Sequence, residues 1–289
     1  MVGGTIRPVS VGLARKFYLT GIFTALALSA IAGCVEGQSS SPNNAHVDLI
    51  AEERAFVAGR YLRVGVLFHL DKGWHIYWQN PGDSGEPPRI EWKLPTGLRA
   101  GPIEWPSPVR LGTGTIIDYG YEDRVLLMAP IHVLPGLVPI SNATIAAEVK
   151  YIVCREVCIP GKASLSLAIP LPADQSVHLA EWRRIFEQTR SQFPKPAPSN
   201  WNISSVADKD RFILSVKGSR TRHAVFFPLE PSVIENSAPQ DVVPTDDGFK
   251  MTLQASDQLL KSIPVLRGLL VFEDGRTFRI AAPVAVHAR

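Results

Sequence analysis

Two of the three cysteines lie four positions apart, in the segment YIVCREVCIPG at residues 151–161. A hairpin corner can bring Cys154 and Cys158 within the roughly 4.4–6.8 Å between α-carbons that a disulfide needs. Such a short loop loses little chain entropy when it is cross-linked, so the bond would stabilise the fold only weakly. Arg155 lies between the cysteines and would favour the thiolate, the species that attacks disulfides. The spacing therefore favours thiol–disulfide exchange, and an inert structural disulfide is the alternative.

A metal site is a second alternative for the same cysteines. Two soft sulfur ligands with a nearby His75 would suit Cu(I). Met128 and Met251 are the only internal methionines, so the chain has no methionine-rich copper surface. Exchange chemistry itself requires neither a metal nor an organic cofactor, and we expect neither.

A hydrolytic site is not supported. Residues 82–85 (Gly-Asp-Ser-Gly) are similar to the nucleophile segment of trypsin-like proteases. Those enzymes place their His and Asp far before the Ser, whereas His75 is only nine residues before Ser84. The Gly and Pro residues around Ser84 predict a turn.

The elements that position the cysteines are predicted to be strands. Apolar residues alternate with period two at residues 60–70, 125–133, 145–153 and 165–171, which is typical of half-buried strands. Gly- and Pro-rich connectors separate them, and no helical pattern intervenes. Antiparallel strands in this arrangement predict a β-sandwich over residues 46–173.

A helix and a linker are expected next, at residues 174–199. Val177, Ile185 and Phe186 belong to an apolar stripe over residues 174–193, and Pro194 would end this helix. The segment KPAPS at residues 195–199 has the composition of a linker. Further strands are predicted at residues 212–216, 224–227, 249–253, 269–272 and 277–281, with Asp274-Gly275 as a hairpin turn. They predict a second sandwich over residues 200–289.

The first 33 residues have the pattern of a secretory signal peptide. Arg15 and Lys16 precede an uncharged apolar run that ends before Cys34, as in bacterial lipoprotein signals. We therefore expect Cys34 to carry lipid and residues 34–45 to be a flexible tether. Three of the 30 basic residues lie in this leader, so the other 27 balance the 27 acidic ones. This balance does not support nucleic-acid binding.

The first predicted sandwich resembles the N-terminal periplasmic domain of the disulfide reductase DsbD, in particular its ScsB-like branch. The resemblance rests on residues 73–82 (GWHIYWQNPG), on residues 119–122 (YGYE) and on the cysteine hairpin followed by Pro160-Gly161. It implies an immunoglobulin-like sandwich with one redox-active pair. We therefore expect an all-β chain of two immunoglobulin-like sandwich domains, joined by one helix and a Pro-rich linker.

The resemblance also implies a function and partners. The pair would take electrons from a thioredoxin-like donor and pass them to oxidised periplasmic proteins, including those of cytochrome c biogenesis. Cys158 would form the mixed disulfide with the donor, and Cys154 would resolve it. Candidates to line the site are His75, Tyr77, Arg155, Asp118 and Glu122.

Two departures from the DsbD pattern affect these expectations. Residues 106–115 contain no clear counterpart of the aromatic cap that shields the family's disulfide. The sequence also contains no membrane electron-carrying segment, so we expect a DsbD- or ScsB-type membrane reductase to be a separate chain. The expected location is the periplasm, with Cys34 as a lipid anchor. A lipid-anchored interaction module with a silent disulfide is the remaining alternative.

Overall fold

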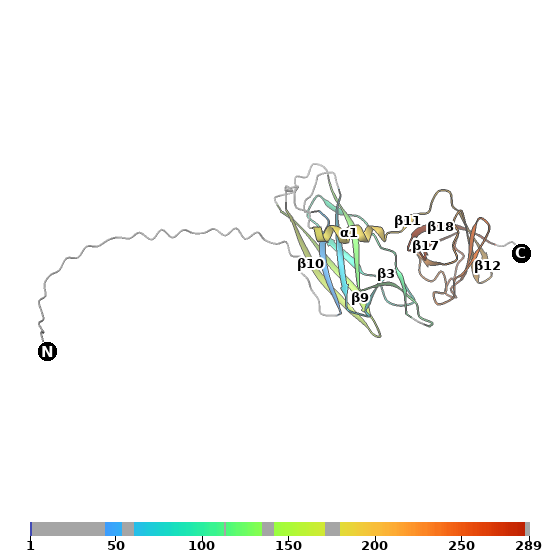
Figure 1. Ribbon diagram of the computed structural model, residues 1–289, viewed down its shortest axis with the longest axis horizontal. Helices are drawn as coiled ribbons and strands as arrows, with labels where there is room; N and C mark the ends of the chain where they lie inside the picture. The colour runs from blue at the N-terminus through green and yellow to red at the C-terminus, as the bar shows by residue number, and fades with distance from the viewer. Residues whose placement is uncertain (2–43, 54–60, 113, 135–141, 171–179, 287–289) are drawn as a thin grey trace. The chain divides into compact units, whose positions relative to one another are not determined.

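The structure is a computed structural model that describes Met1 and residues 44–53, 61–112, 114–134, 142–170 and 180–286 (Figure 1). The predicted signal peptide, Cys34 and most of the predicted tether lie outside the described residues. The first strand begins at Ala45, so it takes in the last residue assigned to the tether. No helix in the described ranges is long and apolar enough to cross a membrane.

The N-terminal sandwich (strands β1 to β10) consists of two antiparallel sheets. The first sheet has the order β1-β2-β8-β5, and the second has the order β10-β9-β3-β7-β6, with β4 paired to β9. Its strands are β1 (Ala45–Ala51), β2 (Tyr61–Leu70), β3 (His75–Gly82), β4 (Arg89–Lys93), β5 (Leu98–Ala100), β6 (Val109–Leu111), β7 (Asp118–Glu122), β8 (Arg124–Val133), β9 (Asn142–Cys154) and β10 (Cys158–Pro170).

The core of this sandwich follows from the period-two pattern. Leu62, Val64, Val66 and Phe68 point to one face of β2 and are all buried. They pack with the alternating apolar residues of β8, β9 and β10 in one cluster. The four strands predicted from this pattern are therefore confirmed.

The opposite face of the first sheet is covered by the helix α1 (Ala180–Ser191), which is drawn across it in Figure 1. Ile185 and Phe186 of α1 pack on Leu67 of β2 and on Leu126 and Met128 of β8. The helix ends at Ser191, two residues before the predicted end. The amides of Gln192 and Phe193 instead bond to carbonyls three residues earlier, as Pro194 disfavours a continued α-helix. Val177 lies outside the described residues.

The C-terminal sandwich (strands β11 to β18) has the strand order β14-β17-β18-β12-β13-β16-β15, with β11 paired to β18. Its strands are β11 (Lys195–Pro196), β12 (Asn202–Asp208), β13 (Arg211–Lys217), β14 (Ala224–Pro228), β15 (Asp241–Pro244), β16 (Gly248–Gln254), β17 (Val265–Phe272) and β18 (Thr277–Val286). The two halves of β18 have different neighbours. Thr277 to Pro283 pair antiparallel with β17, and Val284 to Val286 pair parallel with β12.

Two expectations for this half need correction. The predicted linker at residues 195–199 contains β11, which pairs with Phe278 and Arg279 of β18 and so belongs to the sheet. Strands β12 and β15 were not predicted, because neither alternates apolar and polar residues clearly. The turn at Asp274-Gly275 is confirmed, with Gly275 at a φ of 81°.

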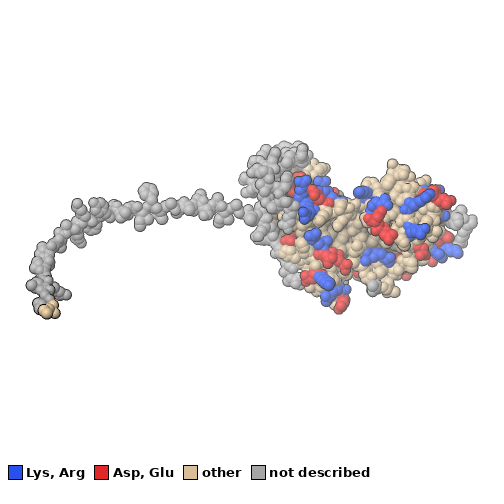
Figure 2. Space-filling model, in the orientation of Figure 1, with Lys and Arg blue, Asp and Glu red and all other residues tan. Residues whose placement is uncertain are grey.

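The two sandwiches share part of one core. Phe227 of β14 and Leu269 of β17 are buried in the apolar cluster of the N-terminal sandwich. The Phe227 ring lies edge-on to Tyr119, with 5.0 Å between centroids, and to Trp78. The described residues of both sandwiches accordingly belong to one compact unit. On the face shown in Figure 2, basic and acidic side chains are interspersed.

Candidate functional site

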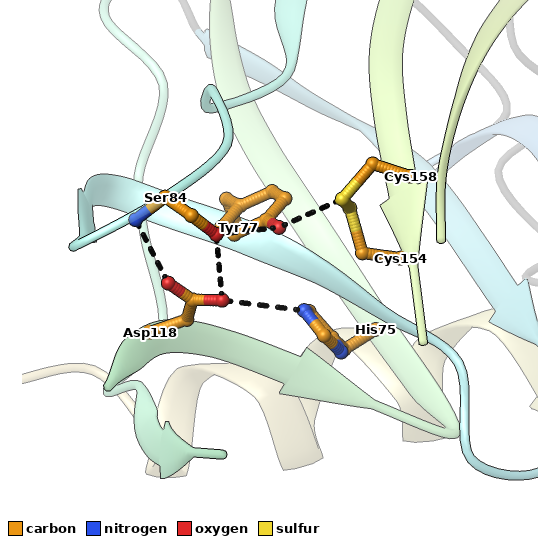
Figure 3. Close-up of a disulfide and its surroundings, with 6 residues drawn as sticks. All are labelled: His75, Tyr77, Ser84, Asp118, Cys154 and Cys158. Atoms are coloured by element: carbon orange, nitrogen blue, oxygen red, sulfur yellow. Dashed lines mark hydrogen bonds and ion pairs between the residues drawn. A yellow bond between two sulfur atoms is a disulfide. The ribbon is translucent and has the colours of Figure 1, made fainter. Parts of the chain in front are cut away.

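A disulfide joins Cys154 and Cys158 at the end of the β9–β10 hairpin (Figure 3). The two residues are direct partners in the register of the strands, and their α-carbons are 4.2 Å apart. The amide of Arg155 donates to the carbonyl of Val157 across the three-residue turn. Antiparallel pairing thus holds the cysteines opposite each other, slightly closer than the range expected from the sequence.

The two cysteines differ sharply in exposure. Cys154 is 2% exposed because it is the last residue of β9, whose preceding residue Val153 is buried in the core. Cys158, the first residue of β10, is exposed. Val157, beside Cys158, is 62% exposed. A partner that approaches the hairpin therefore meets Cys158 first.

Tyr77 of β3 contacts the exposed cysteine. Its hydroxyl is 3.6 Å from Cys158 Sγ and 3.4 Å from Ser84 Oγ (Figure 3). Burial raises the pKa of Tyr77, so the phenol keeps its proton at neutral pH and can donate it to sulfur. The tyrosine ring packs against Gly85, where a β-carbon would come within 2.1 Å of Cζ.

Asp118 holds the turn that carries Ser84. The Ser84 amide donates to Asp118 Oδ1 and the Ser84 hydroxyl donates to Asp118 Oδ2, each at 2.9 Å. Asp118 begins β7, which pairs with β3, so the sheet places the carboxylate beside the end of β3. Ser84 donates to Asp118 and not to His75, so the Ser84 region has the geometry of a structural turn, as predicted.

His75 lies on the other side of the same carboxylate. Its Nε2 is 3.9 Å from Asp118 Oδ2, and its ring is edge-on to Tyr77. Burial lowers the pKa of His75, and the charges of Asp118 and Glu122 oppose this effect only in part. The imidazole is therefore neutral at neutral pH. His75 pairs in register with Cys154 on one side and with Glu122 on the other.

Only some of the predicted lining residues lie beside the disulfide. His75, Tyr77 and Asp118 are brought together beside the disulfide, and Glu122 is an exposed residue next to His75. The Arg155 guanidinium lies over the Trp74 ring, 5.2 Å from its centroid, and among the described contacts none joins it to a sulfur. The roles of all these residues in exchange remain predictions.

Sequence reasoning did not include Ser84 and Gly85 in the site. Both lie in a turn whose composition only indicates a chain reversal. Asp118, the partner of Ser84, is 34 residues away, so no local spacing could have indicated the contact.

Metal ligation is the other chemistry that the sequence indicated for this site. Among the described residues, no cluster of three or more His, Cys, Asp or Glu side chains could hold a metal ion.

Known proteins provide two comparisons and one negative result. Residues 46–170 match the family model described as "Thiol:disulfide interchange protein DsbD, N-terminal". The fold is similar to that in the crystal structure of the N-terminal periplasmic domain of ScsB from Proteus mirabilis. The TM-score is 0.66 at 18% sequence identity, over 87% of this chain and 99% of that chain. No curated protein matches the sequence.

These matches confirm the predicted resemblance and the predicted all-β, immunoglobulin-like fold. The family model covers the N-terminal sandwich except Ala45, and the matched residues include the cysteine hairpin, β3 and β7. The structural match covers too much of the chain to be confined to this sandwich, so it includes the C-terminal one. The segment 46–170, which carries the disulfide, is therefore similar to the N-terminal domain family of DsbD.

Proposed function

We propose that this protein exchanges thiols and disulfides with other proteins through Cys154 and Cys158. The observation that carries the proposal is the unequal exposure of one disulfide, with Cys158 open to a partner and Cys154 buried. Exchange requires a thiolate to reach a sulfur, and access is one of the factors that set its rate. The similarity of residues 46–170 to the DsbD N-terminal family supports the same function.

The reaction balances with a dithiol donor and no cofactor. A donor thiolate attacks Cys158 Sγ, the bond between Cys158 and Cys154 breaks, and Cys154 leaves as a thiolate that takes up a proton. The second donor thiolate attacks the donor sulfur in the mixed disulfide and releases Cys158. The donor is then oxidised by two electrons, and the pair is reduced to two thiols. The same steps in reverse reduce the disulfide of an acceptor.

The proposed partners are a thioredoxin-like donor and oxidised periplasmic proteins. A membrane reductase of the DsbD or ScsB type would supply the electrons from a separate chain. The proposed location is the periplasm, supported by the signal-like leader and by the periplasmic domain that shares this fold. Lipid attachment at Cys34 is part of this proposal.

The reduction potential of the pair tests the function directly. It is measured by trapping free thiols after equilibration in a series of glutathione or dithiothreitol buffers. A potential well above about −300 mV would mark an exchangeable disulfide. A lower value would identify a structural cross-link and favour an interaction module.

The order of the two cysteines is tested by single substitutions. The Cys154→Ser variant keeps the exposed thiol and should accumulate a mixed disulfide with an oxidised thioredoxin-like protein. The Cys158→Ser variant keeps only the buried thiol of the pair and should accumulate little. Equal trapping by both variants would contradict the assignment of Cys158 as the partner-facing sulfur.

A further inference from the structure

A side chain of the C-terminal sandwich reaches the turn beside the disulfide. Asn236 lies in the loop between β14 and β15, and its Nδ2 donates to Asp83 Oδ1 at 2.7 Å. Asp83 precedes Ser84 directly. The other carboxylate oxygen of Asp83 accepts from the Ile117 amide at 2.7 Å. The carboxylate thus connects this loop to the strand that carries Asp118.

The Asn236 side chain is itself held in place. It is 6% exposed, and its Oδ1 accepts from the Tyr119 hydroxyl at 2.7 Å. Its backbone carbonyl accepts from Arg110. Both polar ends of the buried amide are therefore used, and its orientation is fixed by two residues of the N-terminal sandwich.

The turn that Asn236 contacts also contacts Tyr77. Ser84 contacts the hydroxyl of this tyrosine, and Gly85 packs against the ring. A shift of Asp83 would move both residues, since they follow it directly in the chain. The Tyr77 hydroxyl is in turn the group in contact with Cys158 Sγ. A continuous set of contacts thus runs from the C-terminal sandwich to the exposed sulfur.

We propose that Asn236 is a positioning residue for the disulfide, so that the C-terminal sandwich tunes the reactivity of Cys158 through the turn at residues 83–85 and Tyr77. This inference rests on the proposed exchange function and gives the second sandwich a role in it. The Tyr77 hydroxyl donates more strongly to a thiolate than to a disulfide sulfur, so correct placement stabilises the reduced pair.

The test begins with Asn236→Asp in the full chain. The new carboxylate still accepts from Tyr119, but it loses the donor to Asp83 and repels that carboxylate. We expect the equilibrium constant for reduction of the pair by glutathione to fall about two- to fivefold, in the range of one weakened hydrogen bond. Combined with Tyr77→Phe, the substitution should have no further effect, because the hydroxyl it positions is gone.

A charge exchange provides the rescue. In the double variant Asp83→Asn with Asn236→Asp, the amide at 83 donates to the carboxylate at 236 and still accepts from the Ile117 amide. The equilibrium constant should return toward that of the original protein. Recovery would assign the effect to the bond between positions 83 and 236, and the control variant below separates that effect from general stability.

Gln240→Ala is the matched control. Gln240 bonds both backbone groups of Phe226 in the same sandwich and has no described contact with the turn. It should lower the thermal midpoint and leave the equilibrium constant unchanged. The proposal is overturned if Gln240→Ala shifts the equilibrium constant for reduction as much as Asn236→Asp does. It is also overturned if Asn236→Asp lowers this constant by the same factor when Tyr77 has already been replaced by Phe. A wild-type pair that resists reduction would instead refute the exchange function, whatever the variants do.

Discussion

At the scale of single residues, Tyr77 provides the described side-chain hydrogen bond to the disulfide. Replacing Tyr77 by Phe removes the donor and keeps the ring. We expect the equilibrium constant for reduction of the pair to fall about fivefold, which corresponds to about 1 kcal/mol for one hydrogen bond. Thiol trapping in glutathione buffers measures the change.

Tyr121→Phe is a suitable comparison for this prediction. Tyr121 is also buried, but its hydroxyl donates to the Pro106 carbonyl. The variant should lose stability without a change in the redox equilibrium. Equal redox shifts in both variants would show that burial of a tyrosine, and not the contact with sulfur, is responsible.

His75 makes the stability of the fold dependent on pH. Burial is the main cause that lowers its pKa in the folded state, so the unfolded chain binds the proton more readily. The free energy of unfolding should therefore decrease as the pH falls from about 6.5 toward the lowered value in the fold. Above about pH 6.5 this contribution is fully retained. In His75→Gln, denaturant titrations across this window should show a shallower decrease.

Partial desolvation also lowers the pKa of the exposed His69, so this residue contributes a smaller share to the same window. The His75→Gln variant should therefore retain part of the pH dependence, and His69→Gln should remove a separate share. If His75→Gln leaves the slope unchanged, its imidazole is not buried as described.

Single residues also show how far the sequence can predict this site. The cysteine pair and the resemblance to DsbD indicated Tyr77, His75 and Asp118, and the structure brings all three beside the disulfide. Asn236 and Ser84 could not be predicted. Their partners are 153 and 34 residues away, so only the paired sheets bring them together.

At the scale of elements, the turn after β3 depends on a glycine with a left-handed backbone. Gly85 has a φ of 70°, and an added β-carbon would also lie 2.1 Å from Tyr77 Cζ. Gly85→Ala should therefore cost about 1–3 kcal/mol for the backbone conformation and should displace the tyrosine. We expect it to lower both the stability and the equilibrium constant for reduction of the pair.

A substitution at Gly275 separates the loss of stability from the change in the redox equilibrium. It has a similar φ of 81°, but a β-carbon there would meet no atom within 4 Å. Gly275→Ala should lose stability by a comparable amount without any redox change. If Gly275→Ala also lowered the equilibrium constant for reduction, the change in Gly85→Ala could not be assigned to the displacement of Tyr77.

The strands that carry the cysteines were predictable because apolar residues recur at every second position of β9 and β10 and form their buried face. Ala146, Ile152 and Ala168 add apolar residues to the other face without breaking this period. Strand β12 was not, since Ser205 is its only fully buried residue and a polar residue does not mark a core face. Strand β15 is a four-residue edge strand that ends in Pro244, and short edges carry little periodic signal.

At the scale of the whole molecule, β14 connects two cores with neighbouring side chains. Phe226 is buried in the core of its own sandwich, and Phe227 is buried in that of the N-terminal sandwich. Replacing either by Ala should cost about 3–5 kcal/mol. We expect Phe227→Ala to split calorimetric unfolding into two transitions, because it removes the shared packing.

Phe226→Ala should lower the midpoint and keep a single transition, since it leaves the contacts of Phe227 with Tyr119 and Trp78 in place. Two polar contacts also join the sandwiches: Asn80 Nδ2 donates to the Pro228 carbonyl at 2.8 Å, and Asn236 donates to Asp83. A single transition in both variants would show that these contacts are enough to couple the sandwiches.

The position of β18 has a consequence for the order in which the molecule is assembled. This strand follows the other described strands in the chain, yet it lies between β17 and β12, and among the described strands it connects the two parts of their sheet. While the chain is being synthesised or exported, β17 and β12 cannot find their neighbour until residues 277–286 have emerged. The cysteine hairpin emerges more than a hundred residues before β18, so it is made well before the sheet of the C-terminal sandwich can be completed.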